Sequence, residues 1–257
     1  MSLFDRNGRG MIPTDAGERL LVKSGFLVRY MEEMRAEIQS FSGTVRGNVV
    51  AGMPDALAEV IAAKLIDKFV TQYPETSVHF ITSKGGYIYD WLQRGEIDVA
   101  LLYDHQSDET LITEKLLEEE LYFVYKPGHL PTNHNSISFE EVCSLPLVLP
   151  DPQHALRGQL EAHAKSMGLS LNVQSDIDSL RVLMNMAAIG TYYTVLPRRA
   201  LRNEIAAGVL EVHPIVDPTP IRTIYLALPA GRPISTATRL FSDELKNAVS
   251  RLANSPL

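Results

Sequence analysis

The sequence predicts an α/β protein in which one long helix precedes two similar α/β halves. Near the amino end, apolar residues recur at alternating steps of four and three, which is the spacing of a helix with an apolar seam. From residue 46 onward, short apolar strands alternate with helices, and the same alternation restarts at residue 147. Alternation of this kind is typical of mostly parallel sheets that are covered by helices.

Length and composition are those of a folded globular protein. The chain has 257 residues, enough for two lobes of about 100 residues each, and its mean hydropathy is -0.03. No apolar run approaches the roughly 18 residues that cross a bilayer, and the first ten residues lack a signal-peptide core. We therefore predict a cytoplasmic protein without a membrane partner. The single cysteine, Cys143, is expected to be a buried, reduced thiol.

The distribution of charge limits where nucleic acid could bind. The net charge is -7, and phosphate neutralisation requires clustered Lys and Arg. Residues 1–46 carry seven Lys or Arg and six Asp or Glu, a balance of about +1, against about -8 for the remainder. Any contact with DNA is therefore expected at the amino end.

The first predicted element is a helix opened by Pro13 and Thr14. The Thr14 hydroxyl is placed to cap free backbone N–H groups, and Asp15 suits the positive end of the helix dipole. Ser42 and Gly43 are expected to end the helix. Three heptads favour a coiled-coil dimer seam over an amphipathic helix that packs on its own domain. The seam consists of Leu20, Ser24, Leu27, Met31, Met34, Ile38 and Phe41.

The first α/β half begins with a strand that Gly52, Pro54 and Asp55 turn into a helix with an apolar residue at every fourth position. Ser138 and Glu141 have the spacing of a capping box, which predicts a short helix there. The other predicted elements are strands at 48–51, 77–81, 99–102 and 121–125, and helices ending before Pro74 and at Gly95.

The second half repeats the pattern. The strand at 147–149 leads through Pro150, Asp151 and Pro152 into a helix that Gly168 ends. A long apolar strand at 221–228 is placed to carry the chain back between the lobes. The remaining elements are a strand at 171–174, a helix at 179–188, a strand at 193–196, a helix at 198–206, a strand at 210–212 and a last helix at about 235–253.

Motifs of the common enzyme classes are missing from the sequence. It contains no Walker phosphate loop, dinucleotide-binding glycine pattern, nucleophile elbow or H-E-x-x-H, so we predict no enzyme, no cofactor and no metal. The closest histidines, His129 and His134, lack partners at ligand spacing. Residues 83–86 either hold an anion on free N–H groups or simply form the entry to a helix. The three glutamates at 118–120 are expected to form a solvated face.

Several segments resemble the LysR family of transcriptional regulators. Residues 3–10 and 13–17 resemble the end of that family's winged helix-turn-helix and the start of its linker helix. The resemblance implies a wing remnant at 1–13 and a linker helix at 14–43, with most of the DNA-binding head absent. Arg6 and Arg9 match wing arginines that would contact phosphate, although exposed arginines are usually ordinary surface. Further matches lie at 47–52, 69–74, 92–98, Gly190 and 196–197.

The resemblance also implies a fold: a linker helix followed by a two-lobed effector domain like a periplasmic binding protein. Lobe I is expected at 47–124 and 226–257, and lobe II at 125–225. Ligands of open α/β sheets bind beyond the strand carboxyl ends, near helix amino termini. For Pro54 and Asp55, helix capping is an equally good explanation. The effector-binding residues expected by position are Met53, Pro54, Asp55, Gly85, Leu102, Tyr103, Asp151, Asp178, Ser179 and Thr191.

Two departures from the family pattern bear on the ligand. Pro54 and Asp55 stand where many relatives offer Ser or Thr, and a carboxylate there would repel an anionic effector, which favours a neutral or amine-bearing one. Tyr192 and Tyr193 follow Gly190, and their rings would either narrow the cleft or stack on a ligand.

These observations predict the effector-binding and oligomerising portion of a transcriptional regulator. The expected partners are a small-molecule effector and further copies of the chain, as a homodimer or homotetramer, with promoter DNA bound only through the absent head. The alternative is a free-standing solute-binding protein with the same lobes. The absence of a signal peptide and the heptad helix both count against that alternative.

Overall fold

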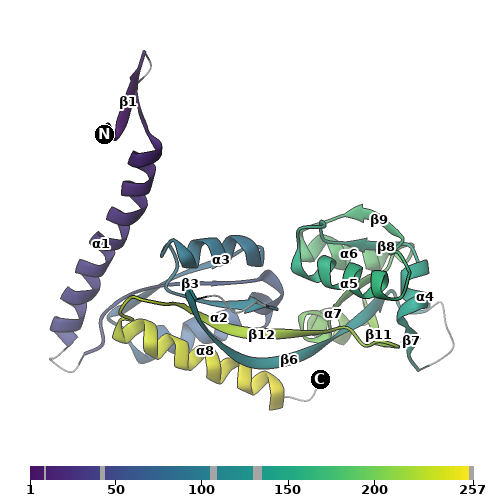
Figure 1. The fold of residues 1–257 in the computed structure, drawn as a ribbon. Helices are drawn as coiled ribbons and strands as arrows, with labels where there is room; N and C mark the ends of the chain where they lie inside the picture. Colours follow the sequence, from purple (N-terminus) through teal and green to yellow (C-terminus); the bar gives the residue numbers. More distant parts are fainter. Residues whose placement is uncertain (9, 41–43, 105–108, 130–134, 255–257) are drawn as a thin grey trace.

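The computed structural model describes residues 1–8, 10–40, 44–104, 109–129 and 135–254. At the amino end, β1 (Phe4–Asn7) and β2 (Gly10–Pro13) form an antiparallel hairpin, and α1 (Asp15–Ser40) follows. The Thr14 hydroxyl accepts a hydrogen bond from the Gly17 amide at 3.1 Å, so the predicted cap is confirmed. Ser42 and Gly43 lie outside the described residues. Helix α1 projects away from the two lobes, with the hairpin at its far end (Figure 1).

Lobe I is a sheet with helices on both faces. Along the sheet the strands run β4-β3-β5-β12-β6, with β3 parallel to both β4 and β5. Helices α2 and α8 share one hydrophobic core on one face of the sheet. There the rings of Phe69 and Phe241 meet edge to face, with their centroids 5.0 Å apart. Helix α3 packs in a separate core with β5. The bounds are β3 (Gly47–Met53), α2 (Asp55–Gln72), β4 (Thr76–Thr82), α3 (Gly85–Gln93), β5 (Val99–Tyr103) and α8 (Thr236–Asn254).

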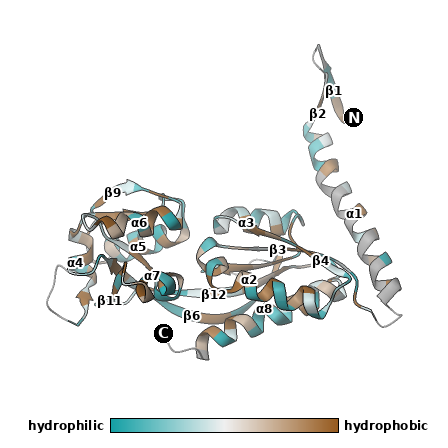
Figure 2. Ribbon diagram, turned by 180° about the vertical axis from the view of Figure 1, so that it is seen from behind, coloured by the Kyte–Doolittle hydropathy of each residue, from teal (hydrophilic) through white to brown (hydrophobic). Residues whose placement is uncertain are grey.

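Helix α8 shows why the sequence pattern gives this packing. Hydrophobic and hydrophilic residues alternate along it (Figure 2). Leu245 and Val249 are fully buried against lobe I, while Asp243 and Arg239 stay exposed. One apolar stripe on a helix is the pattern expected for packing on a sheet.

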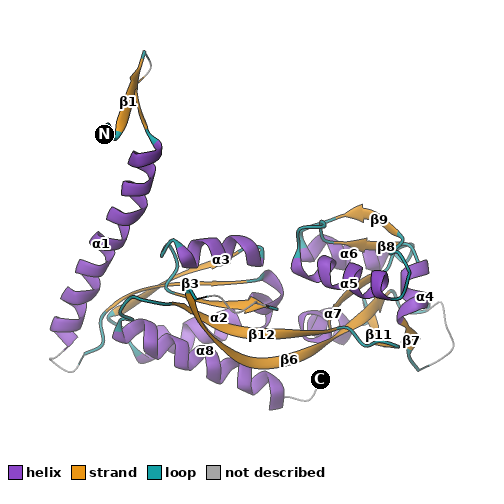
Figure 3. Ribbon diagram, in the orientation of Figure 1, coloured by secondary structure: helices purple, strands orange, loops and turns teal. Residues whose placement is uncertain are grey.

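Two long strands, β6 (Leu111–Tyr125) and β12 (Ile221–Pro229), connect the lobes. They pair antiparallel, and Figure 3 shows them running from one lobe into the other. Along β6, Leu117 packs on the core of lobe I and Leu121 belongs to the core of lobe II. The exact boundaries between lobe I and lobe II, expected at 124/125 and 225/226, remain a proposal. The strand expected at 121–125 is in fact the last part of a strand that begins ten residues earlier.

Lobe II is built around the far ends of these strands. Strands β10 and β11 both pair with β6, β7 pairs with β11, and the two-stranded sheet β8-β9 adjoins β10 through a bridge between Leu147 and Tyr193. The bounds are β7 (Ile137–Ser138), α4 (Phe139–Ser144), β8 (Leu147–Leu149), α5 (Ala155–Ser166), β9 (Val173–Asp176), α6 (Leu180–Ile189), β10 (Thr194–Pro197), η1 (Arg198–Leu201), α7 (Arg202–Ala206) and β11 (Glu211–Val216).

Several helices of lobe II begin or end at residues with clear local signals. Ser138 and Glu141 form the complete capping box of α4, and the Cys143 side chain on the same helix is buried. Gly190 ends α6 at a φ of +94°, a left-handed conformation that favours glycine. The helix expected at 198–206 begins as the 3-10 turn η1 before it becomes α7. Within the residues that the structure describes, no helix is both long and apolar enough for a membrane span.

Candidate ligand-binding site

Helix amino termini from both lobes converge on a small cavity of about 60 Å³. It lies where the strands of lobe I and lobe II end and their helices begin, which is the position expected for a ligand of an α/β fold. Lobe I supplies Pro54, Asp55, Ala56, Ser83, Lys84 and Tyr103. Lobe II and the connecting strand supply Pro150, His154, Leu156, Asp178, Leu180, Leu183, Leu196 and Arg222.

Four of the ten residues expected at the site line this cavity: Pro54, Asp55, Tyr103 and Asp178. Asp151 adjoins it, because its carboxylate pairs with Lys84.

The other expected residues have different surroundings. Met53 is fully buried in the core under α2 and α8, and Leu102 is buried in the core under α3. Gly85 is the first residue of α3. Ser179 caps α6 by accepting from the Val182 amide at 3.4 Å, while Thr191 lies beyond the opposite end of that helix and is exposed. The structure does not bring these five residues into the lining of the cavity.

Lys84 joins the two lobes across the cavity. It stands at the entrance to α3 in lobe I, and its ammonium group donates to the carboxylates of Asp151 and, at 2.8 Å, Asp178 in lobe II. The Asp151 amide also donates to Asp178 at 3.2 Å. The hydrogen bond to Asp151, followed by that to Asp178, raises the pKa of Lys84, and the Lys84 ammonium lowers the pKa of Asp151. We call this three-residue group the Lys84 latch.

Arg222, which lines the cavity, belongs to a buried ion pair. Arg222 of β12 donates through Nε to Glu119 Oε1 of β6 at 2.7 Å, and through Nη2 to the Tyr103 hydroxyl at 2.6 Å. The side chains of Arg222 and Glu119 are only 3% and 5% exposed. The expectation that 118–120 form a solvated face is therefore wrong for Glu119, because every second residue of a strand faces the same side and this one faces inward.

Burial shapes the titration of the groups around this ion pair. Loss of solvent raises the pKa of the Tyr103 hydroxyl, which therefore stays protonated at neutral pH. Burial likewise raises the pKa of Asp104, whose carboxylate accepts from the Thr223 amide at 2.7 Å. Tyr103 therefore offers the cavity a hydroxyl that is held in place by Arg222.

His154 caps the helix that enters the cavity from lobe II. Its Nδ1 accepts from the Leu156 amide at 3.2 Å. Burial, followed by the nearby positive charge of Arg222, lowers the pKa of this histidine, against smaller opposing effects of Asp178 and Asp151. His154 is therefore neutral at pH 7.

This shift predicts an acid-sensitive stability. A histidine whose pKa is lower in the folded state opposes protonation of that state, so stability falls as the pH falls through about 6.5, the unfolded value. Asn at position 154 keeps an acceptor for the helix cap and does not titrate. We expect the melting temperature of His154→Asn to fall less between pH 7 and pH 5 than that of the parent. The control is His79→Asn, a change at an exposed histidine on β4. Equal slopes for His154→Asn and the parent would contradict this account.

Two α/β lobes joined by two strands, with a cavity where helix amino termini meet, define a ligand-binding domain like that of periplasmic binding proteins. The family model described as "LysR substrate binding domain" matches residues 42–250. The chain therefore belongs to the LysR family of transcriptional regulators, and the resemblance seen in the sequence is confirmed.

Two relatives illustrate the match. The nitrogen assimilation regulatory protein nac of Klebsiella aerogenes is 28% identical over 97% of this chain and 81% of its own length. The HTH-type transcriptional regulator BbuR of Bordetella bronchiseptica is 25% identical over 98% of this chain and 78% of its own length. LysR-type regulators bind small-molecule effectors and DNA and commonly form oligomers.

Solved structures show the same fold. A full-length OxyR variant from Pseudomonas aeruginosa superposes with a TM-score of 0.75 at 22% identity, covering 95% of this chain and 80% of that one. The CcmR regulatory domain of Synechocystis, solved in complex with 2-PG, superposes with a TM-score of 0.72 at 19% identity, covering 82% of this chain and 100% of that one.

Proposed function

We propose that this chain senses a small polar molecule that enters between the lobes and replaces the Lys84 latch. The main support is the latch itself, in which one lysine of lobe I binds two carboxylates of lobe II beside the cavity. The cavity of about 60 Å³ has room for a few water molecules only. A ligand therefore has to displace Lys84 or separate the lobes. Either event couples binding to lobe arrangement, which is how a ligand shifts a conformational equilibrium.

The latch also suggests the ligand's chemistry. A purely anionic ligand would engage Lys84 and leave the carboxylates of Asp151 and Asp178 without their cation, and a purely cationic one would leave Lys84 unpaired. Asp55, exposed at the cavity, further disfavours an anion. A zwitterion offers a carboxylate to Lys84 and an ammonium group to the two aspartates. We infer that the effector carries both groups, as an amino acid does.

A thermal-shift comparison tests this function. Each amino acid is assayed beside the amine that lacks its carboxylate and the acid that lacks its ammonium group. A ligand that binds only the folded protein stabilises it by about 2.7 kcal/mol at a hundred times its Kd. We expect at least one zwitterion to raise the melting temperature and its two counterparts to have little effect. Stabilisation by the acids or amines alone would reject the zwitterion, and no response to any of them would remove support for the function.

We further propose that α1 dimerises the chain, with a homotetramer as the larger alternative. Four of the predicted seam residues, Leu20, Met31, Met34 and Ile38, are 41–69% exposed on α1. Nothing is described of the Leu27 side chain, and Phe41 lies outside the described residues. A stripe of large apolar side chains on a projecting helix favours a partner helix, because the hydrophobic effect opposes its exposure.

Ile38→Glu is expected to shift the chain toward monomer, because it places a charge in the seam. Light scattering coupled to size-exclusion chromatography measures the mass at micromolar concentration. Arg19→Glu changes an exposed residue of the same helix outside the seam and should leave the mass unchanged. A monomeric parent, or an Ile38→Glu variant with the parent's mass, would contradict the dimer.

The amino-terminal hairpin is suited to phosphate contacts. Arg6 is exposed on β1, while Arg9 lies outside the described residues. A phosphate contact fixes a protein on DNA and carries no direct sequence information. We propose that promoter recognition depends on a groove-entering helix-turn-helix of the family kind, which the hairpin does not supply.

A further inference from the structure

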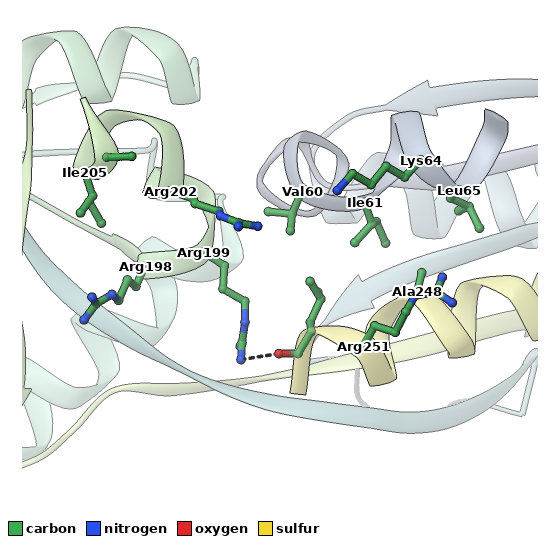
Figure 4. A pocket seen from close by; sticks show the side chains of 12 residues that line it. Val60, Ile61, Lys64, Leu65, Arg198, Arg199, Arg202, Ile205, Ala248 and Arg251 are labelled. Carbon is green, nitrogen blue, oxygen red and sulfur yellow. Dashed lines mark hydrogen bonds between the residues drawn. The ribbon is translucent and has the colours of Figure 1, made fainter. Parts of the chain in front are cut away.

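A second, larger cavity lies between the lobes, away from the Lys84 latch. It has a volume of about 470 Å³ and is bounded by α2 and α8 of lobe I and by η1 and α7 of lobe II. Its apolar lining comes mainly from Val60, Ile61 and Leu65 on α2, and from Ile205 on α7 (Figure 4). A cavity of this size is in the range that encloses small organic ligands.

Positive charge surrounds this apolar lining. Among the described residues that line the cavity, five are cations and none is Asp or Glu, in a chain whose net charge is -7. In Figure 4, Arg202 and Lys64 point toward each other across the space. The five cations are Lys64, Arg198, Arg199, Arg202 and Arg251.

Three of these five cations have no ion pair with any residue that the structure describes. Arg199 donates to the Leu252 carbonyl at 2.8 Å, which links the lobes. Arg198 and Arg199 also border a hollow that contains residues 118–120. Within the described parts of the chain, Lys64, Arg202 and Arg251 make no ion pair. These three are the cations available to a ligand.

We propose that this cavity is a second ligand site, which takes an organic anion with an apolar body. A carboxylate or phosphate suits the planar guanidinium groups, which bind either in a bidentate manner. An alkyl or aryl body suits the apolar surface of α2 and α7. The required chemistry differs from that of the first cavity, where two aspartates pair with Lys84.

The fold connects the two sites. Helix α2 begins at the first cavity with Asp55 and lines the second with Ile61, while Leu196 lines the first and Arg198 the second. An anion held between α2 and α7 would restrain the separation of the lobes. Binding at each site then changes the affinity of the other by the same factor, since coupling is reciprocal. The second site does not depend on the zwitterion proposed for the first.

Calorimetric titration of the full chain with octanoate and with octyl phosphate tests the site. One anion should bind per chain, while octylamine and 1-octanol, which share the alkyl body, should bind at least tenfold more weakly. Arg202→Gln and Arg251→Gln should each weaken anion binding by about tenfold, the loss of one charge-assisted hydrogen bond. The matched control is Arg239→Gln, an exposed arginine on α8 outside the cavity, which should keep the parent's affinity.

Three results would overturn the proposal. One is the absence of binding by both anions at millimolar concentration. Another is unchanged affinity in Arg202→Gln and Arg251→Gln, with thermal melting showing that both variants fold. The third is octanoate binding that is lost in Lys84→Met and retained in Arg202→Gln, because that pattern would assign the anion to the first cavity.

Discussion

Arg222→Leu is expected to lower the free energy of unfolding by about 3–5 kcal/mol. The substitution leaves the Glu119 carboxylate, which is 5% exposed, without the guanidinium that neutralises it. It also removes the donor to the Tyr103 hydroxyl. Urea unfolding at one fixed protein concentration measures the loss.

A double variant separates this cause from general damage to the lobe connection. Glu119→Leu with Arg222→Leu removes both charges, and buried pairs replaced in this way are often close to neutral. We expect it to recover most of the lost stability. The exposed pair of Lys115 and Glu118 on the same strand is the control, and Lys115→Met should cost under about 1 kcal/mol. A double variant as unstable as Arg222→Leu would show that the charge left in the core is not the cause.

The second large effect is expected from Lys84→Met on ligand binding. Loss of a charge-assisted hydrogen bond of about 1.5–3 kcal/mol corresponds to roughly 10- to 100-fold weaker binding. Calorimetry with the zwitterion found by thermal shift measures the change. Lys246→Met is the matched control, because Lys246 is a partly exposed lysine that pairs with Glu114 outside the cavity.

Stability distinguishes a binding role of Lys84 from a structural one. The side chains of Lys84 and Asp151 are 31% and 27% exposed, so the latch itself should contribute under about 1 kcal/mol. Lys84→Met is therefore expected to fold and melt nearly as the parent does. Ligand affinity equal to that of the parent would show that the effector does not engage the latch.

Much of the fold follows from local patterns in the sequence. Two helix starts can be predicted because capping depends on residues three positions apart. They are the starts at Thr14 and at the capping box of Ser138 and Glu141. The strand at 147–149 and the last helix are found close to their expected bounds, since apolar periodicity reports which side of an element is buried.

The candidate site was less predictable because its key contacts are distant in sequence. Arg222 and Glu119 are 103 positions apart, and no spacing rule relates them. A run of three glutamates ordinarily indicates a solvated face, whereas the middle one here is buried and pairs with Arg222 of β12. The sequence draws attention to the segment 83–86, but not to the pairing of Lys84 with two aspartates of the other lobe.

The end of a strand indicates where a site lies, but the direction of each side chain decides which residues line it. Met53 and Leu102 lie near strand ends that face the cavity, yet both side chains are buried in the hydrophobic cores of lobe I. Successive side chains of a strand point to opposite faces, so of two neighbouring residues one can face the hydrophobic core while the other faces the site. Tyr103, one position beyond Leu102, does line the cavity.

The most direct test of the central claim is a crystal structure of this chain with the zwitterion that raises its melting temperature. We expect the ligand between the lobes, with its carboxylate on Lys84 and its ammonium group on Asp151 or Asp178, and with the direct contacts of Lys84 to these aspartates broken. A ligand bound elsewhere, with the latch intact and the cavity unchanged, would contradict the account.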